Sequence, residues 1–370
     1  MANNQTYSTG QSSEAPINWW RTDMGEAEKK EMNSAFEGRR FTTSSSAQEV
    51  ESIAASILGI KHVLCTNSGS SALLMSLLAI GVGPGDEVIV PSLTWIATAN
   101  AAAILGAKVI LCDTLGESPV IDHDQIESLI TSKTRAIVPV HLNGRVCNLG
   151  AIQEISAKYG IHIIEDSCKA LLSKFQQKYL GTRGEIGCYS LGMISPVSIG
   201  FGGLVATNNS SLYEKLLLIR DHGVNRSPER YDHLGFNFKV SDILVSMAKP
   251  QFLDYETRIQ SLIQLHDYYE ANVKNNKLKI MPIDKKSGSV PVYVEAFSLE
   301  REEIINYLAD KNISTSRYHK SIDEAAYLGN AVGRFPNSLK FAQNSFILPS
   351  GPSQSYSDID RVIRHLNSYK

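Results

Sequence analysis

Short apolar runs alternate with longer amphipathic stretches along most of the chain. The runs are rich in β-branched residues, which is typical of buried strands, and the stretches between them, about ten to twenty residues long, have helical periodicity. The runs occupy residues 62–66, 87–91, 108–112, 136–140 and 162–166. Because apolar strands that alternate with helices form parallel sheets covered on both faces, this pattern predicts an α/β domain built on a mainly parallel sheet.

The segments on either side extend this prediction. Helical periodicity covers residues 26–58, with a polar interruption at 39–47, and strand-like runs at 185–191 and 203–207 predict a hairpin that closes the sheet. From Asp242 one long helical stretch leads to a second alternating region, which predicts a small C-terminal α+β domain. We therefore divide the chain into a mobile N-terminus (1–17), a large α/β domain (18–250), and a helical linker with the small domain (251–370).

Composition narrows the class of protein. The chain has 370 residues, 43% of them hydrophobic, which suffices for a large core. Its 36 basic and 38 acidic residues give a net charge of -2 and no basic footprint for nucleic acid. The five scattered cysteines predict neither a disulfide framework nor a metal site, and indicate a cytoplasmic protein. A signal peptide or a membrane span is not expected, because no apolar run approaches ~18 residues.

Three segments place candidate binding residues at predicted strand ends. Gly69 and Ser70 lie at a strand–helix junction, where free N–H groups suit a phosphate, although such residues also begin helices that bind nothing. Trp95 follows a strand and either stacks on a planar ligand ring or packs in the core. Glu165 and Asp166 end a buried strand, where ligands of α/β sheets bind. A carboxylate there either pairs with a protonated ring nitrogen or begins the next helix.

In this order the segments resemble the DegT-type sugar aminotransferases, fold-type-I enzymes that use pyridoxal phosphate (PLP). The resemblance covers residues 18–260, continues more weakly to the end, and rests on NSGSSAL, GPGDEVIVPSLTWIATANA, HIIEDSCKA, IGFGG and LGFNFKVSD. It implies a mainly parallel seven-stranded sheet with a smaller C-terminal α+β domain. It also implies a homodimer with PLP or pyridoxamine phosphate (PMP) at the interface. The implied reaction moves an amino group to a nucleotide-linked keto sugar in polysaccharide or natural-product biosynthesis.

The resemblance also implies roles for single residues. The positions expected at the cofactor's phosphate are Gly69, Ser70, Ser190 and, from the neighbouring subunit, Asn237. The pyridine ring is expected to stack on Trp95, and its nitrogen to bind Asp166. No position corresponds to a metal ligand.

One position departs from the family pattern. The family reads approximately S-F-x-x-x-K where this chain has residues 190–195, so that Ser195 stands where a lysine normally holds the cofactor through a Schiff base. No lysine lies between Lys178 and Lys215, and a shift of one or two residues in the alignment therefore restores none. A serine hydroxyl can neither form that bond nor shuttle a proton as the lysine does.

Three interpretations follow. In the first, Lys169, three residues after Asp166, supplies the missing amine. Otherwise Lys169 binds an oxygen of the cofactor or a bound anion, or faces solvent. In the second, the chain binds PLP or PMP without a lysine, as relatives that deoxygenate nucleotide sugars do with a histidine at this position. In the third, it is a non-catalytic paralogue that binds a sugar nucleotide or pairs with an active subunit. The first hypothesis remains an aminotransferase-like enzyme. His319 is either on the substrate side or at the surface.

Overall fold

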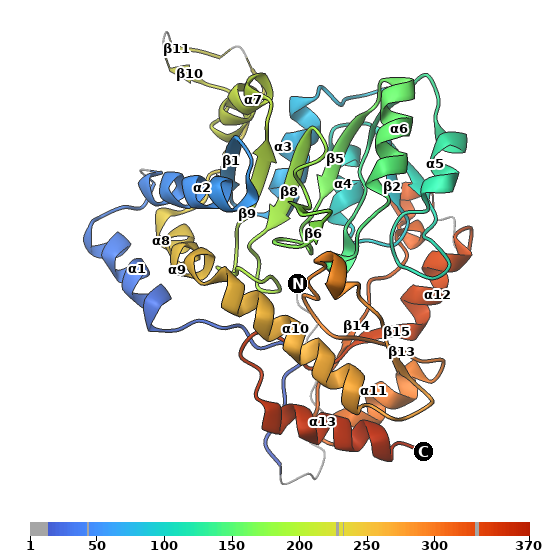
Figure 1. The fold of residues 1–370 in the computed structure, drawn as a ribbon. Coiled ribbons are helices and arrows are strands. Elements are labelled where there is room, and N and C mark those ends of the chain that lie inside the picture. The colour runs from blue at the N-terminus through green and yellow to red at the C-terminus, as the bar shows by residue number, and fades with distance from the viewer. Residues whose placement is uncertain (1–13, 43, 227–228, 232, 330–332) are drawn as a thin grey trace.

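The computed structural model describes residues 14–42, 44–226, 229–231, 233–329 and 333–370. A large α/β domain and a smaller C-terminal domain are joined by three helices, α8 (Asp242–Ser246), α9 (Ala248–Leu253) and α10 (Tyr255–Asn272) (Figure 1). In these described segments no helix is both long and apolar enough to cross a membrane.

Seven strands form the central sheet, as predicted, in the order β1-β9-β8-β5-β4-β2-β3. They are β1 (His62–Thr66), β2 (Glu87–Pro91), β3 (Lys108–Cys112), β4 (Thr134–Ile137), β5 (His162–Asp166), β8 (Ile186–Ser190) and β9 (Gly203–Thr207). Only β9 runs against its neighbours, pairing antiparallel with β1 and β8, while the other four pairs are parallel. The sheet is therefore mainly parallel and the expected hairpin is confirmed.

The prediction for the fourth strand was wrong in its bounds. The sequence placed a strand at 136–140, but β4 ends at Ile137. Pro139 cannot donate a ladder hydrogen bond, and only its carbonyl still accepts one, from the backbone N–H of Asp166. The strand therefore ends before the proline, and Val140 keeps a single isolated bridge to Asp166.

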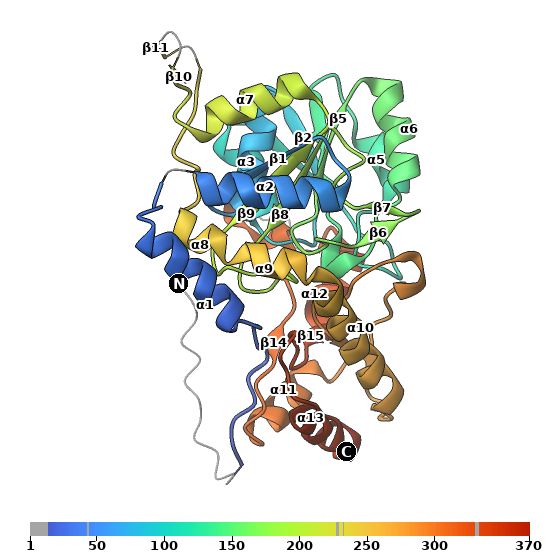
Figure 2. The same ribbon diagram turned by 60° about the vertical axis from the view of Figure 1, so that its left-hand side comes forward.

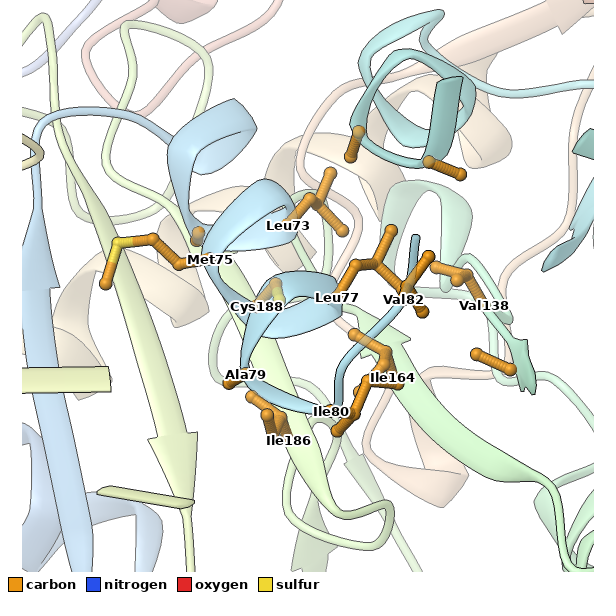
Figure 3. Packing of buried hydrophobic residues seen from close by; sticks show 14 of the residues in the cluster. Leu73, Met75, Leu77, Ala79, Ile80, Val82, Val138, Ile164, Ile186 and Cys188 are labelled. Atoms are coloured by element: carbon orange, nitrogen blue, oxygen red, sulfur yellow. The ribbon is translucent and has the colours of Figure 1, made fainter. Parts of the chain in front are cut away.

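Helices cover both faces of the sheet because successive strand residues point to opposite sides. On one face, α3 (Gly69–Ala79), α4 (Ala97–Ile104) and α7 (Ser210–Arg220) bury a shared apolar cluster. Figure 3 shows part of it, with Leu77 of α3 beside Val82 and near Ile164 of β5. On the other face, α2 (Ser45–Leu58) covers the β1 side, while α5 (His123–Leu129) and α6 (Leu149–Tyr159) cover the β3 side.

The long helical stretch expected after Asp242 is broken into three helices. They are α8 (Asp242–Ser246), α9 (Ala248–Leu253) and α10 (Tyr255–Asn272), which descend from the large domain toward the small one (Figure 2). Pro250 explains the first break, because it has no N–H to donate to the carbonyl of Ser246. The polar interruption predicted at 39–47 separates α1 (Glu26–Glu37) from α2.

The small domain has a four-stranded antiparallel sheet in the order β12-β13-β15-β14, packed against helices. Its elements are β12 (Lys279–Ile280), β13 (Glu295–Phe297), α11 (Arg301–Ala309), β14 (Ser316–Arg317), α12 (Pro336–Asn344), β15 (Ser345–Ile347) and α13 (Tyr356–Ser368). Two short hairpins lie outside both sheets: β6 (Lys174–Phe175) with β7 (Lys178–Tyr179), and β10 (Asn225–Arg226) with β11 (Glu229–Arg230).

The start of the described chain packs on this small domain. Ile17 is buried and bridges Ile313, and Trp20 bridges Ser350. Residues 1–13 of the segment expected to be mobile lie outside the described residues, and the packed part of the chain begins before residue 18. The division at residues 250 and 251 stays a prediction.

Candidate functional site

Most of the candidate residues gather at one edge of the sheet. The strands β1, β2, β5 and β8 all point the same way, so that their carboxyl ends meet at this edge. Asp166 and Ser190 are the last residues of β5 and β8, and Gly69 and Trp95 follow β1 and β2 within a few residues. This is the position where α/β sheets bind their ligands.

Asp166 is buried and held by neutral donors. One carboxylate oxygen accepts the hydroxyl of Thr98 at 2.8 Å, and the other accepts the backbone N–H of Cys168 at 3.1 Å. Among the described residues, no lysine, arginine or histidine nitrogen lies within ion-pair distance of this carboxylate. A buried carboxylate without a cationic partner is costly, and each oxygen has a lone pair left for a ligand N–H. The arrangement therefore fits a protonated ring nitrogen.

The first turn of α3 packs directly on the ends of β5 and β8. A Cβ atom added to Gly69 would lie 2.9 Å from the sulfur of Cys168 and 3.1 Å from the Cβ of Ser190, so only glycine fits here without a shift. Ser68 begins the helix by accepting the N–H of Ser71 at 3.0 Å. The remaining N–H groups of this turn and the Ser190 hydroxyl thus border one another, as a phosphate site requires. Ser70 is exposed and lines a cavity of about 170 Å³ between α3 and α4.

Trp95 is not a core residue. Its side chain is 62% exposed, and its ring centroid lies 6.0 Å from that of His319. The small domain supplies His319 because Ser321 bridges Leu93 in antiparallel register, which brings position 319 opposite position 95. Burial lowers the pKa of His319 to about 4, and the nearby charge of Lys169 acts in the same direction. His319 is partly buried beside Trp95, and its place on the substrate side stays a prediction.

Lys169 extends toward the loop that lacks a lysine. Its Nζ donates a hydrogen bond of 2.7 Å to the carbonyl of Ile194, the residue immediately before Ser195. Ser195 itself is 1% exposed, and its hydroxyl donates to the carbonyl of Ser190 at 2.9 Å. Burial lowers the pKa of Lys169 to about 8, although Cys168 and Asp166 act in the opposite direction. The amine and the position of the expected Schiff-base lysine are thus neighbours.

Asn237 lies beside the turn that precedes α3. Its carbonyl accepts the Asn67 side-chain amide at 3.4 Å, and the carbonyl of Phe238 accepts the Asn67 N–H at 2.9 Å. The Asn237 side chain is exposed, which leaves it available to another molecule. Lys239, two residues on, pairs with Asp221 at 2.7 Å. That a neighbouring subunit supplies Asn237 stays a prediction.

Glu165 belongs to the scaffold rather than to the site. Because neighbouring strand residues point to opposite sides, its carboxylate faces away from that of Asp166 and is fully buried. It accepts the backbone N–H groups of Gly181, Arg183 and Gly184 and the Nε2–H of His141. Burial opposes ionisation, but these hydrogen bonds hold the pKa of Glu165 below its usual value.

Sequence reasoning missed two groups of the site. Thr98, which orients Asp166, lies one turn into the stretch after Trp95, and its spacing gave no signal. The Ile194 carbonyl could not have been found from residue types, because every residue has a carbonyl.

Comparison with known proteins agrees with this geometry. GDP-perosamine synthase of Escherichia coli O157:H7 is 30% identical over 317 residues, covering 84% of this chain and 86% of that protein. GDP-perosamine synthase of Caulobacter vibrioides is 31% identical over 336 residues, covering 86% and 88%. A Streptococcus pneumoniae protein assigned as a sugar aminotransferase, solved in its PMP form, superposes with a TM-score of 0.90 at 22% identity over 96% of this chain and 97% of its own.

The same Streptococcus pneumoniae protein in its PLP form also superposes with a TM-score of 0.90. The family model for the DegT/DnrJ/EryC1/StrS aminotransferases matches residues 22–367, which include both domains and every candidate residue above. With this fold and this arrangement at the carboxyl edge of the sheet, the chain belongs to the DegT/DnrJ/EryC1/StrS aminotransferase family.

Proposed function

We propose that this chain is a PLP- or PMP-dependent, aminotransferase-like enzyme that acts on a nucleotide-linked keto sugar in polysaccharide or natural-product biosynthesis. The observation that carries the proposal is the buried carboxylate of Asp166, which has neutral donors and, among the described residues, no cationic side chain within ion-pair distance. A protonated pyridine nitrogen is the partner that such a carboxylate lacks. The family to which the chain belongs supports the same cofactor.

Each part of the cofactor has a matching group in this proposal. The N–H groups at the start of α3 and the Ser190 hydroxyl would hold the phosphate, and Trp95 offers an exposed aromatic face to the ring. Asp166 would keep the ring nitrogen protonated, and Thr98 would keep that carboxylate in place. When bound, PLP supplies an electron sink and carries amino groups.

We take the substrate class from the two GDP-perosamine synthases, whose name specifies a GDP-linked sugar. We also propose a homodimer. Met193 and Phe201 lie in the loop that leaves the site and are 53% and 74% exposed, which fits a surface that a second copy covers. The family resemblance implies that this second copy supplies Asn237 to the phosphate.

Ser195 favours a second candidate function. Without an amine at this position, the chain could be a non-catalytic paralogue that binds a sugar nucleotide or pairs with an active aminotransferase. A lysine-free, PMP-dependent sugar dehydratase is the third candidate, but it needs a base at this position, and the Ser195 hydroxyl donates its proton to a carbonyl.

Titration of the purified chain with PMP and PLP, followed by absorption and tryptophan fluorescence, tests the first candidate. We expect saturable binding of both compounds, weakened at least tenfold by Asp166→Asn, which keeps the shape of the side chain but removes its charge. Asp310→Asn changes an exposed carboxylate at the end of α11 and is the matched control. Equal affinity in the Asp166→Asn variant, or no binding by the unmodified chain, would overturn the proposal. Binding without amino transfer to any nucleotide-linked keto sugar would favour the paralogue.

A further inference from the structure

We propose that Lys169 takes over the work of the lysine absent from position 195 and binds the aldehyde carbon of PLP covalently through its Nζ. The inference rests on the proposed function, because it requires the cofactor to bind at this edge of the sheet. It assigns the amine to a different strand end, β5 instead of the loop after β8.

The backbone around Lys169 is fixed on all sides. Asp166 pairs with Cys188 of β8, and its carbonyl accepts the N–H of His141. The turn that follows is closed by the bond from the Cys168 N–H to the Asp166 carboxylate and by the bond from the Ala170 N–H to the Ser167 carbonyl. Lys169 therefore leaves a hydrogen-bonded turn that directly follows Asp166, the residue that would bind the ring nitrogen.

The amine of Lys169 lies beside the loop that contains position 195. Its Nζ lies 2.7 Å from the carbonyl oxygen of Ile194, which adjoins Ser195 along the chain. An amine that started from position 195 and one that starts from position 169 thus reach the same loop. Ser195 does not compete for this role, since its hydroxyl is bonded to the carbonyl of Ser190.

The surroundings of Lys169 favour a reactive, neutral amine. Besides the Ile194 carbonyl, the titratable groups that face it are Asp166 and Cys168 from its own turn and His319 from the small domain. Among the described residues, no carboxylate lies within ion-pair distance of Nζ. Burial lowers the pKa of Lys169 to about 8. At pH 8 about half of such amines are neutral, against roughly 0.3% of ordinary lysines.

The step is a condensation without any redox change. The lone pair of the neutral Nζ attacks the aldehyde carbon, and a carbon–nitrogen double bond replaces the carbon–oxygen double bond. The aldehyde oxygen leaves as water together with the two hydrogens of the amine. Only the chain and PLP are consumed, so that no further reactant is needed.

Borohydride trapping tests the inference directly. The full chain is mixed with equimolar PLP at pH 8, reduced with borohydride, digested, and mapped by mass spectrometry. We expect the phosphopyridoxyl label on Lys169, suppressed by excess PMP, which occupies the site but has no aldehyde. The labelled fraction should rise between pH 7 and pH 9, whereas labelling of exposed lysines should continue to rise toward pH 10.5.

A pair of variants separates the inference from the proposed function. Lys169→Arg keeps the positive charge and should lose the label, while Lys215→Arg, which changes an exposed lysine in α7, should keep it. PMP should still bind the Lys169→Arg variant, because the amine of PMP needs no covalent bond. If PMP and PLP bind and the label is absent or lies on another lysine, the inference is wrong and the proposed function stands. If neither compound binds, both are wrong.

Discussion

The buried carboxylate of Glu165, the residue before the last in β5, lets the stability of the scaffold around the site be measured. Glu165 accepts four hydrogen bonds, two at each oxygen. One oxygen receives the N–H groups of Arg183 and Gly184, both at 2.6 Å, and the other receives Gly181 N–H at 2.8 Å and His141 Nε2–H at 3.1 Å. Glu165→Gln keeps the volume of the side chain but replaces one of these acceptors by an NH2 donor.

The cost of this substitution follows from the four donors. Two of them lose their acceptor and face another donor in a site where Glu165 and His141 are 0% exposed. A buried donor without a partner costs about 1–3 kcal/mol, and we therefore expect a loss of about 2–6 kcal/mol in the free energy of unfolding. His141 lies between this carboxylate and the Cys147 N–H, which its Nδ1 accepts at 3.2 Å.

Urea unfolding followed by circular dichroism measures the loss, with Glu154→Gln on the exposed face of α6 as the matched control. The native pKa of Glu165 is lowered, so the stability it supplies is present above the pKa of the unfolded state and is lost as the pH falls through the native value. The Glu165→Gln variant should therefore be less stable than the control at pH 7, and the difference should shrink as the pH falls toward the native pKa of Glu165. A Glu165→Gln variant within 1 kcal/mol of the control at neutral pH would refute the reasoning.

Three further substitutions test other contacts. Lys169→Met removes an ammonium group whose pKa burial lowers to about 8. Thermal denaturation should therefore show a free energy of unfolding about 1–3 kcal/mol higher at pH 7, and this gain should disappear as the pH rises from 8 to 10.5. An unchanged gain at high pH would contradict this. The guanidinium of Arg145 lies 2.5 Å from the fully buried carboxylate of Glu295, and Arg145→Met leaves that carboxylate without its partner. We expect urea unfolding to show a loss of about 3–5 kcal/mol in the free energy of unfolding. Adding Glu295→Leu should restore most of this loss. Gly69→Ala should weaken PMP binding in a fluorescence titration, because the added Cβ would lie 2.9 Å from the sulfur of Cys168. Adding Cys168→Ala to the same chain should restore part of the affinity. No restoration would mean that the obstruction lies elsewhere.

The large domain could be predicted almost entirely from local patterns. The bounds of β1, β2, β3, β5 and β9 agree with the apolar runs, since a short β-branched run at a buried position has few other structures open to it. Prolines explain two of the errors, since their missing N–H ended β4 early and made the first break in the helical stretch after Asp242. Such breaks depend on which hydrogen bond is lost, and periodicity alone does not show this.

The site was predicted less completely. Strand-end motifs pointed to Gly69 and Asp166 and the family resemblance to Ser190, and all three lie at the same edge because parallel strands bring their carboxyl ends together. They did not separate the roles of Glu165 and Asp166, which are neighbours in the chain but point to opposite sides of the sheet.

The sequence by itself determined that the chain is an α/β protein with family motifs and that no lysine lies between Lys178 and Lys215. Only the tertiary structure decided which lysine amine lies beside the loop that contains Ser195. Lys169 meets the carbonyl of Ile194 because β5 and β8 are adjacent in the sheet, and Trp95 meets His319 because the small domain bridges the end of β2. Local periodicity sets which residues form strands, whereas the order of those strands and the docking of a second domain set which side chains meet.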